Sequence, residues 1–305
     1  MQFVNARSMV RAAKAGGYAV PAFNSNGATY ALTRAALESA QEMASPLILQ
    51  VYQPNIVYRG FPFFVAQTQA LCADLGITVP VCLQVDHGKS VAVCREALAA
   101  GLTSVMIDGS HEPFETNVAW SRKVLAMARE CGATVEAEIG YVAGNEPKAE
   151  SQIGRVPVPE CPSFVPGRTT VSEAVEFVQA APVDLLAVAV GTIHGVYEHQ
   201  TDIDFDLVAE LNAAVDVPLV QHGTGGVSLD DLARLAQAGM AKINFGEPFR
   251  YAYVQRFGEH IDDMEHLWHA WRIDEALKEE LKQDMIGLIE ALGSAGKAQS
   301  LGDPQ

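Results

Sequence analysis

Three histidines, His87, His194 and His222, stand at or just beyond the ends of short apolar segments of this sequence. A single histidine in such a place is most often a hydrogen-bonded core or surface residue. Three imidazoles that converge and leave a fourth position open are instead the ligand set of a catalytic zinc site. Because all three follow segments of the same kind, the sequence predicts a site for a first-row metal ion, and cobalt, manganese or iron would also suit it.

Carboxylate and amide side chains also lie near the ends of apolar segments. Asp86 directly precedes His87, Glu138 lies near the end of a fifth apolar segment, and Asn244 lies near the end of the last one. Positioned aspartate and glutamate side chains exchange protons with substrates as general acids and bases. His199, in contrast, lies in a polar stretch, and we expect it to be solvated and without a role.

Eight apolar segments alternate with stretches of helical pattern, which is the rhythm of βα units. Several segments are apolar at successive positions, as parallel strands buried on both faces are. The predicted strands are 18–24, 46–52, 80–87, 104–110, 134–140, 185–191, 218–223 and 241–246. The predicted helices between and after them are 28–43, 62–75, 91–100, 113–131, 171–180, 205–214 and 229–238.

Eight such units predict an α/β chain folded as a (β/α)8 TIM barrel, with residues 1–305 as a single domain. A doubly wound open sheet is the weaker alternative, because no G-x-G-x-x-G fingerprint follows the first strand. In a TIM barrel the carboxyl ends of the strands form the active face, so the polar residues above are expected to meet there.

Two segments depart from the repeating pattern. Residues 141–170 are rich in Gly, Pro and charge, and a connection of this length inside a barrel predicts a mobile active-site loop. Residues 248–297 predict C-terminal helices, which include Trp268 and Trp271 and would cover one barrel end or a subunit contact.

Composition narrows the class of protein. The 305 residues are 49% hydrophobic and carry a net charge of −16, which predicts a compact globule that does not bind nucleic acid. Five cysteines without a Cys-x-x-Cys pair are expected to be reduced and buried. The chain shows neither a signal-like N-terminus nor an apolar run long enough for a bilayer, so we expect a cytoplasmic protein without membrane contact.

Seven short motifs follow one another in an order that resembles the class II, zinc-dependent ketose-bisphosphate aldolases, over nearly the whole chain. Each motif is weak alone, and the series is specific. The motifs are YAVPAFN at 18–24, VDHG at 85–88, MIDGS at 106–110, VEAEIG at 135–140, LAVAVGTIHG at 186–195, LVQHG at 219–223 and SAGK at 294–297.

The resemblance implies a role for each matching position. His87, His194 and His222 would be the Zn²⁺ ligands, and Glu138 would approach the metal. Asp86 would exchange the proton of the substrate hydroxyl, and Glu146 on the long loop would handle the proton beside the carbonyl. Asn244 would steady the enediolate, while Asn24 would line the pocket. The resemblance also implies a homodimer or homotetramer.

These residue types suit aldol chemistry on physical grounds. Cleavage of a bond beside a carbonyl leaves an enolate, and a divalent ion that chelates the carbonyl and hydroxyl oxygens stabilises its charge as a Lewis acid. Acids and bases on either side of the bond each add roughly 10² to 10⁴ in rate.

The chain departs from the family where the substrate phosphate is usually held. Gly225 replaces a usual serine, Glu247 replaces a usual threonine, and Tyr52 stands where a serine usually faces the substrate. A carboxylate about 4 Å from a phosphate charge costs on the order of 4 kcal/mol at an effective dielectric constant near 20. We therefore predict a donor without phosphate, such as a dihydroxyacetone-like group. The predicted substrate-binding residues are Asn24, Tyr52, Gly195, Gly223, Thr224, Gly225 and Glu247.

Three alternatives stay open. An ordinary fructose- or tagatose-bisphosphate aldolase could tolerate these replacements, with Thr224, Arg250 or a monovalent cation as compensation. A metal-dependent sugar isomerase or epimerase would use the same enediolate without bond cleavage. A noncatalytic sugar-binding protein is disfavoured, because the predicted metal ligands and proton-transfer carboxylates are all present. In every case the expected partner is a sugar or sugar phosphate.

Overall fold

A computed structural model describes residues 2–142, 144, 167–200, 202–261 and 269–301. Glu146, Cys161 and Trp268 lie outside the described residues, as does most of the predicted loop 141–170.

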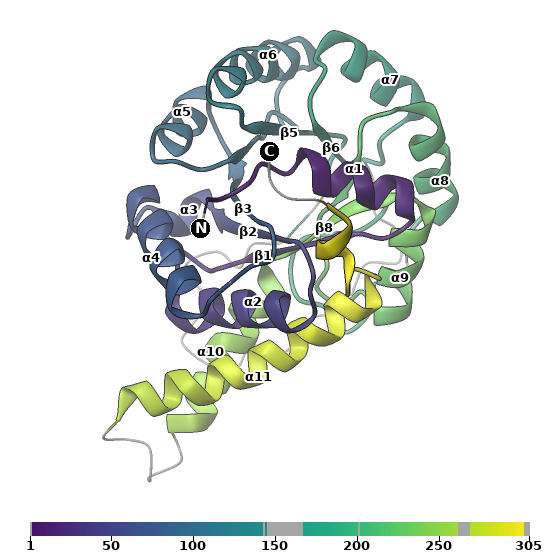
Figure 1. Ribbon diagram of the computed structural model, residues 1–305. Coiled ribbons are helices and arrows are strands. Elements are labelled where there is room, and N and C mark those ends of the chain that lie inside the picture. The colour runs from purple at the N-terminus through teal and green to yellow at the C-terminus, as the bar shows by residue number, and fades with distance from the viewer. Residues whose placement is uncertain (1, 143, 145–166, 201, 262–268, 302–305) are drawn as a thin grey trace.

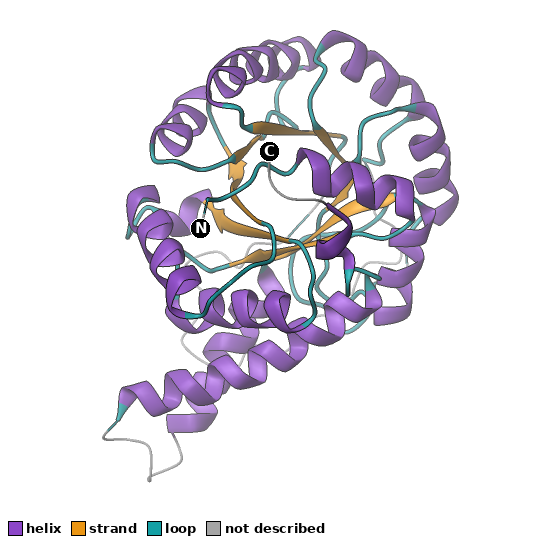
Figure 2. Cartoon of the chain, in the orientation of Figure 1, coloured by secondary structure: helices purple, strands orange, loops and turns teal. Residues whose placement is uncertain are grey.

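Eight parallel strands close into a barrel in sequence order, and helices surround it (Figures 1 and 2). The predicted (β/α)8 barrel is confirmed, and no predicted strand end differs from the observed one by more than three residues. Almost every residue of the strands is buried, as expected for a sheet covered on both faces. The strands are β1 (Val20–Asn24), β2 (Leu47–Tyr52), β3 (Val81–Gly88), β4 (Ser104–Ile107), β5 (Thr134–Ile139), β6 (Leu185–Val188), β7 (Leu219–Gln221) and β8 (Met240–Phe245).

The helices of the repeat begin close to the predicted residues, and three of them match in full. The predicted N-cap at Ser228 is confirmed, because its hydroxyl accepts a hydrogen bond from the backbone N–H of Asp231 at 3.1 Å. The helices are α2 (Tyr30–Glu42), α4 (Phe61–Asp74), α5 (Val91–Ala99), α6 (Phe114–Cys131), α7 (Val171–Ala180), α8 (Phe205–Ala214) and α9 (Leu229–Ala238). A short helix, α3 (Gln53–Ile56), follows β2.

A helix that the sequence analysis did not predict, α1 (Arg7–Gly16), covers one end of the barrel (Figure 1). Its buried residues Met9, Val10 and Ala13 pack against residues from the first half of several strands, including Val20 and Ile48. This apolar cluster closes the amino-terminal end of the barrel. The carboxyl ends of the strands are therefore left as the accessible mouth.

The predicted C-terminal helical extension is confirmed as α10 (Glu247–Ile261) and α11 (Ala270–Ala291), followed by the 3₁₀ turn η1 (Lys297–Leu301). The pair projects beyond the barrel wall (Figure 1). Along α11, the side chains of Leu277, Leu281 and Met285 are buried, and the helix makes its main contact with α2.

Cys72, Cys82 and Cys94 are free and buried, as predicted, whereas Cys131 is free but exposed at the end of α6, which corrects the prediction for that residue. None of the described helices has the length and apolar character required to cross a bilayer.

Candidate metal centre and active site

A cavity of about 290 Å³ lies at the carboxyl ends of the strands, where the active sites of TIM barrels are found. The predicted residues that line it are Asn24, Tyr52, Asp86, His87, Glu138, His194, Gly223, Asn244 and Glu247. Lys89, His111 and Arg250 also line it, although the sequence analysis gave them no firm role. The structure therefore brings most of the predicted site into one hollow.

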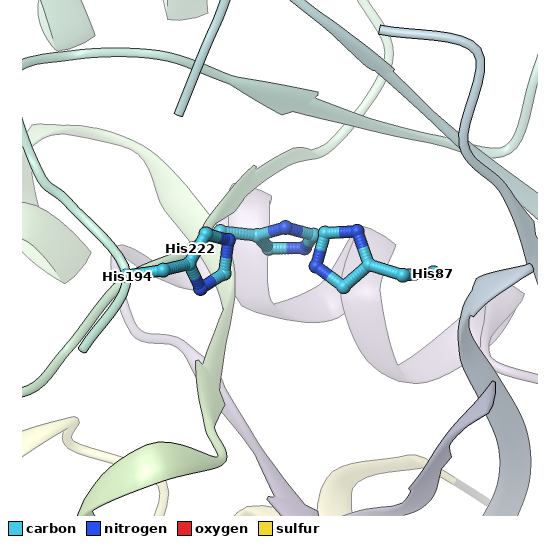
Figure 3. A group of neighbouring side chains, drawn as sticks. All are labelled: His87, His194 and His222. Carbon is cyan, nitrogen blue, oxygen red and sulfur yellow. The ribbon is translucent and has the colours of Figure 1, made fainter. Parts of the chain in front are cut away.

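The three histidine rings lie together, as Figure 3 shows; His87 and His194 line the cavity, whereas His222 is fully buried and does not line it. The centroid of the His87 ring lies 5.2 Å from that of His194 and 4.8 Å from that of His222, and the last two are 5.8 Å apart. One ring nitrogen from each residue lies within 4.8 Å of the others, so the three could hold a metal ion together.

An irregularity in β3 directs both Asp86 and His87 into the cavity. Successive side chains of a regular strand point to opposite faces. Here the pairing of β3 with β4 shifts register between Val85 and Gly88, and His87 has a left-handed φ of 49°. The following Gly88 allows the close approach, because a Cβ there would lie 2.5 Å from the Met106 carbonyl oxygen. Bulges beside active sites commonly re-aim side chains in this way.

Each histidine ring has a carboxylate on the nitrogen that points away from the other rings. Nδ1 of His87 lies 2.8 Å from Asp108 Oδ2. Nε2 of His222 lies 3.1 Å from Glu136 Oε1, and Nδ1 of His194 lies 3.2 Å from Glu247 Oε1. Such carboxylate–histidine pairs fix the tautomer and orientation of a metal-binding imidazole.

The opposite ring nitrogens remain available. Within the described part of the chain, His194 Nε2 and His222 Nδ1 are buried and have no hydrogen-bond partner. His222 Nδ1 lies 2.9 Å from Glu138 Oε2, but the pair lacks the alignment of a hydrogen bond, and this carboxylate oxygen is likewise unpartnered. Buried polar atoms normally have partners, so these atoms aimed at one point suit a shared cation.

The charges around the rings also favour a cation. Burial raises the pKa of the Glu136 carboxyl, but Lys242 and His222 outweigh burial and lower it to about 2. Burial likewise opposes ionisation of Glu247, and the neighbouring His194 lowers its pKa to about 2. Burial lowers the pKa of His222, yet the carboxylates of Glu136 and Glu138 raise it to about 9. The centre is therefore rich in ionised carboxylates, whose field attracts a divalent ion or a proton.

Asp86 is held by two amide side chains at the edge of this centre. Asn24 Nδ2 donates to its Oδ2 at 2.7 Å, and Asn244 Nδ2 donates to its Oδ1 at 3.1 Å. Asn24 is itself oriented, because its Oδ1 accepts from the backbone N–H of Tyr52 at 2.9 Å. The carboxylate lies 4.0 Å from His87 Nε2, which places a proton acceptor beside the candidate metal position.

Comparison with known proteins agrees with this geometry. The profile of the class-II fructose-bisphosphate aldolases matches residues 4–297. The chain belongs to this family. It is 34% identical over 302 residues to a fructose-bisphosphate aldolase of Staphylococcus aureus, with 98% of this chain and 100% of the relative covered.

Two further similar proteins are also named as aldolases. A 6-phospho-5-dehydro-2-deoxy-D-gluconate aldolase of Bacillus licheniformis is 35% identical over 303 residues, covering 98% of this chain and 97% of the relative. The crystal structure of the YdjI aldolase of Escherichia coli K12 superposes with a TM-score of 0.81 at 27% identity, covering 97% of this chain and 100% of that one. The protein is thus an aldolase, an enzyme of the lyase class.

Thr224 and Gly225 of this aldolase do not line the described walls of the cavity, and neither does Gly195. The Thr224 hydroxyl donates to the Asn244 carbonyl at 2.8 Å. Gly225 faces the backbone of Gly195, whose carbonyl oxygen would lie 1.8 Å from a Cβ at position 225. A serine therefore cannot be accommodated there without movement of the backbone.

Gln200 braces the loops that carry His194 and Gly225, a role that the sequence analysis did not predict. Its buried amide nitrogen donates to the carbonyls of Ile193 at 3.0 Å and Gly225 at 2.8 Å, and its oxygen accepts from the Ile193 N–H at 2.9 Å. Asp108, Glu136 and Lys242 were likewise not assigned a role. Asp108 and Glu136 stand near polar strand ends, and this position was the signal that could have identified them.

We expect Gly225→Ala to destabilise the aldolase. Overpacking costs about 1–3 kcal/mol, which corresponds to a fall in Tm of roughly 2–5 °C for a chain of this size. Gly287→Ala in α11 is the matched control, because among the described residues no neighbouring heavy atom lies within 4 Å of a Cβ there. Helix propensity should make that control equal to or more stable than the wild type. Equal Tm values for Gly225→Ala and the wild type in a thermal unfolding measurement would contradict the close approach.

Proposed function

We propose that this protein is a metal-dependent aldolase that reversibly cleaves a ketose through an enediolate, with Zn²⁺ held by His87, His194 and His222 and approached by Glu138. The observation that carries the proposal is the set of three imidazoles, each with one nitrogen held by a carboxylate and the other directed to a common point. Zinc suits three imidazoles and an open position, and Co²⁺ or Mn²⁺ could replace it.

When bound, the ion supplies Lewis-acid stabilisation of the negative charge that develops on the donor oxygens. The protein's own residues then manage the protons. In the cleavage direction, Asp86 accepts the proton of the substrate hydroxyl as the carbon–carbon bond breaks and the aldehyde forms. The amides of Asn24 and Asn244 hold the Asp86 carboxylate in place for this transfer. Glu146, which lies outside the described residues, stays our proposed acid for the donor carbon.

The donor end of the proposed substrate carries no phosphate. Glu247 lines the cavity and is ionised, and its contact with His194 fixes it there. Repulsion of about 4 kcal/mol, estimated for charges 4 Å apart, would act on a phosphate at this end. A hydroxyl group facing Glu247, or a monovalent cation beside it, agrees with the charge. Tyr52 and Gly223, which also line the cavity, are the other proposed substrate contacts.

An ordinary bisphosphate aldolase is the second candidate, and the names of the relatives favour it, because both refer to phosphorylated sugars. Arg250 on the cavity wall would then bind the anion. A sugar isomerase or epimerase stays as an alternative of another class. The homodimer or homotetramer and the cytoplasmic location stay predictions, and Val254, Ile261 and Trp271 are exposed apolar side chains on α10 and α11 that a second copy could cover.

The test is a panel of free and phosphorylated ketoses assayed for aldehyde release. Chelation should abolish release, and Zn²⁺ should restore it. Free ketoses should be the better substrates; a strong preference for phosphorylated ones would identify the ordinary aldolase, and a rearranged ketose without aldehyde would identify the isomerase. His222→Ala should resemble the chelated enzyme. His199→Ala is the matched control, because His199 is exposed outside the cavity.

A further inference from the structure

The carboxylates beside the three histidines come from different places in the fold. Asp108 follows β4 and Glu136 lies within β5, so both belong to the barrel. Glu247 is the first residue of α10, separated from the end of β8 by Gly246 alone, and it reaches a histidine 53 residues earlier in the sequence.

We propose that Glu247 is a positioning residue for the metal centre, one that orients the His194 ring so that Nε2 faces the ion. This inference rests on the proposed metal site but not on the identity of the sugar. A residue of the cavity wall would therefore serve the metal ligand.

His194 needs such support more than the other two histidines. His87 lies on β3 and His222 directly follows β7, whereas His194 lies on a loop six residues beyond β6. Its ring is partly buried, and Glu247 at 3.2 Å is its described side-chain hydrogen-bond partner. A long loop holds a ring less precisely than a strand does, and an outer carboxylate restricts both its rotation and its tautomer.

The start of α10 is a firm base for this contact. Phe249, two residues further along, is buried and packs edge-to-face against Phe23 of β1, with centroids 5.5 Å apart. The backbone N–H of Arg250 donates to the Gly246 carbonyl at 3.1 Å, which closes the first turn. An acidic residue also suits a helix N-terminus, but that effect alone does not require contact with a ring from another loop.

The experiment measures Zn²⁺ affinity of chelator-treated protein by competition with a chromophoric chelator, without substrate. Glu247→Ala should weaken Zn²⁺ binding about 10- to 100-fold, the usual effect of losing an outer-shell partner. Glu247→Gln should stay within about tenfold of the wild type, because its amide oxygen can still accept from the His194 Nδ1–H. Glu210→Gln, on the exposed face of α8, is the matched control and should bind as the wild type does.

Unfolding must be distinguished from loss of the contact. Each metal-free variant is therefore compared with the wild type by circular dichroism and thermal unfolding. If Glu247→Ala does not fold, the Zn²⁺ affinity of Glu247→Thr replaces it in the test. The visible spectrum of the Co²⁺-substituted protein should change in the Ala or Thr variant and stay close to the wild type in Gln. Zn²⁺ affinity equal to the wild type in the folded Ala or Thr variant would overturn the inference. Because no sugar is used, this outcome is independent of the proposed donor.

Discussion

Asp86→Asn is expected to lower kcat/KM for aldol cleavage by about 10² to 10⁴, the usual contribution of a positioned general acid or base. A carboxamide cannot accept the proton of the substrate hydroxyl. It would also face two amide donors, those of Asn24 and Asn244, with only one oxygen to accept from them. The measurement is steady-state aldehyde release with the best ketose of the panel.

The same substitution should leave Zn²⁺ affinity nearly unchanged, because Asp86 lies 4.0 Å from His87 Nε2 and the three rings keep their own carboxylates. Asp74→Asn is the matched control, since Asp74 is exposed at the end of α4. Activity within tenfold of the wild type would remove Asp86 from the proposed mechanism. A parallel loss of Zn²⁺ would show instead that Asp86 supports the metal centre.

The barrel could be predicted because its strands carry the pattern of a sheet buried on both faces. Runs such as 185–190 are apolar at every position, and they recur with helical stretches between them. The helix α1 escaped prediction because it lacks a start signal, since its N-cap residue Ala6 has no side chain that can cap. The short α3 spans only four residues, too few for a helical period to be visible in the sequence.

The candidate site was predictable where residues fall at the ends of predicted strands. His87 and His222 fall at strand ends, and the barrel brings strand ends together. The partners of these histidines were not predictable in the same way. Lys242 and Glu136 form a fully buried pair at 2.7 Å although they are 106 residues apart, and such a pairing exists only after barrel closure.

Position 247 shows the same limit. The resemblance to the family implies that a carboxylate stands where a threonine is usual, and hence that a phosphate would be repelled. It does not indicate what the carboxylate binds, because the loop with His194 is placed by tertiary contacts such as those of Gln200. The Gly225 replacement is similar, since only the fold shows that the Gly195 carbonyl fills the space of a side chain.

Substitution of Glu247 by Gln should then shift the donor preference of the enzyme. The change removes one negative charge from the cavity wall while an amide oxygen stays available to His194, so the metal centre is largely kept. Removal of a repulsion of about 4 kcal/mol predicts a rise of roughly 10² to 10³ in the ratio of kcat/KM values, phosphorylated over free donor. The measurement compares matched pairs of ketoses that differ only in the donor phosphate.

The gain should come from charge alone, because a serine hydroxyl cannot be restored at Gly225 next to the Gly195 carbonyl. The gain in the ratio should therefore diminish as the salt concentration rises, because ions that enter the open cavity screen the charge of Glu247. Glu210→Gln removes one charge far from the cavity and should leave the ratio unchanged, which separates the local effect from the change in net charge. A wild-type enzyme that already prefers the phosphorylated donor, with a ratio that Glu247→Gln does not alter, would mean that the phosphate does not lie beside Glu247.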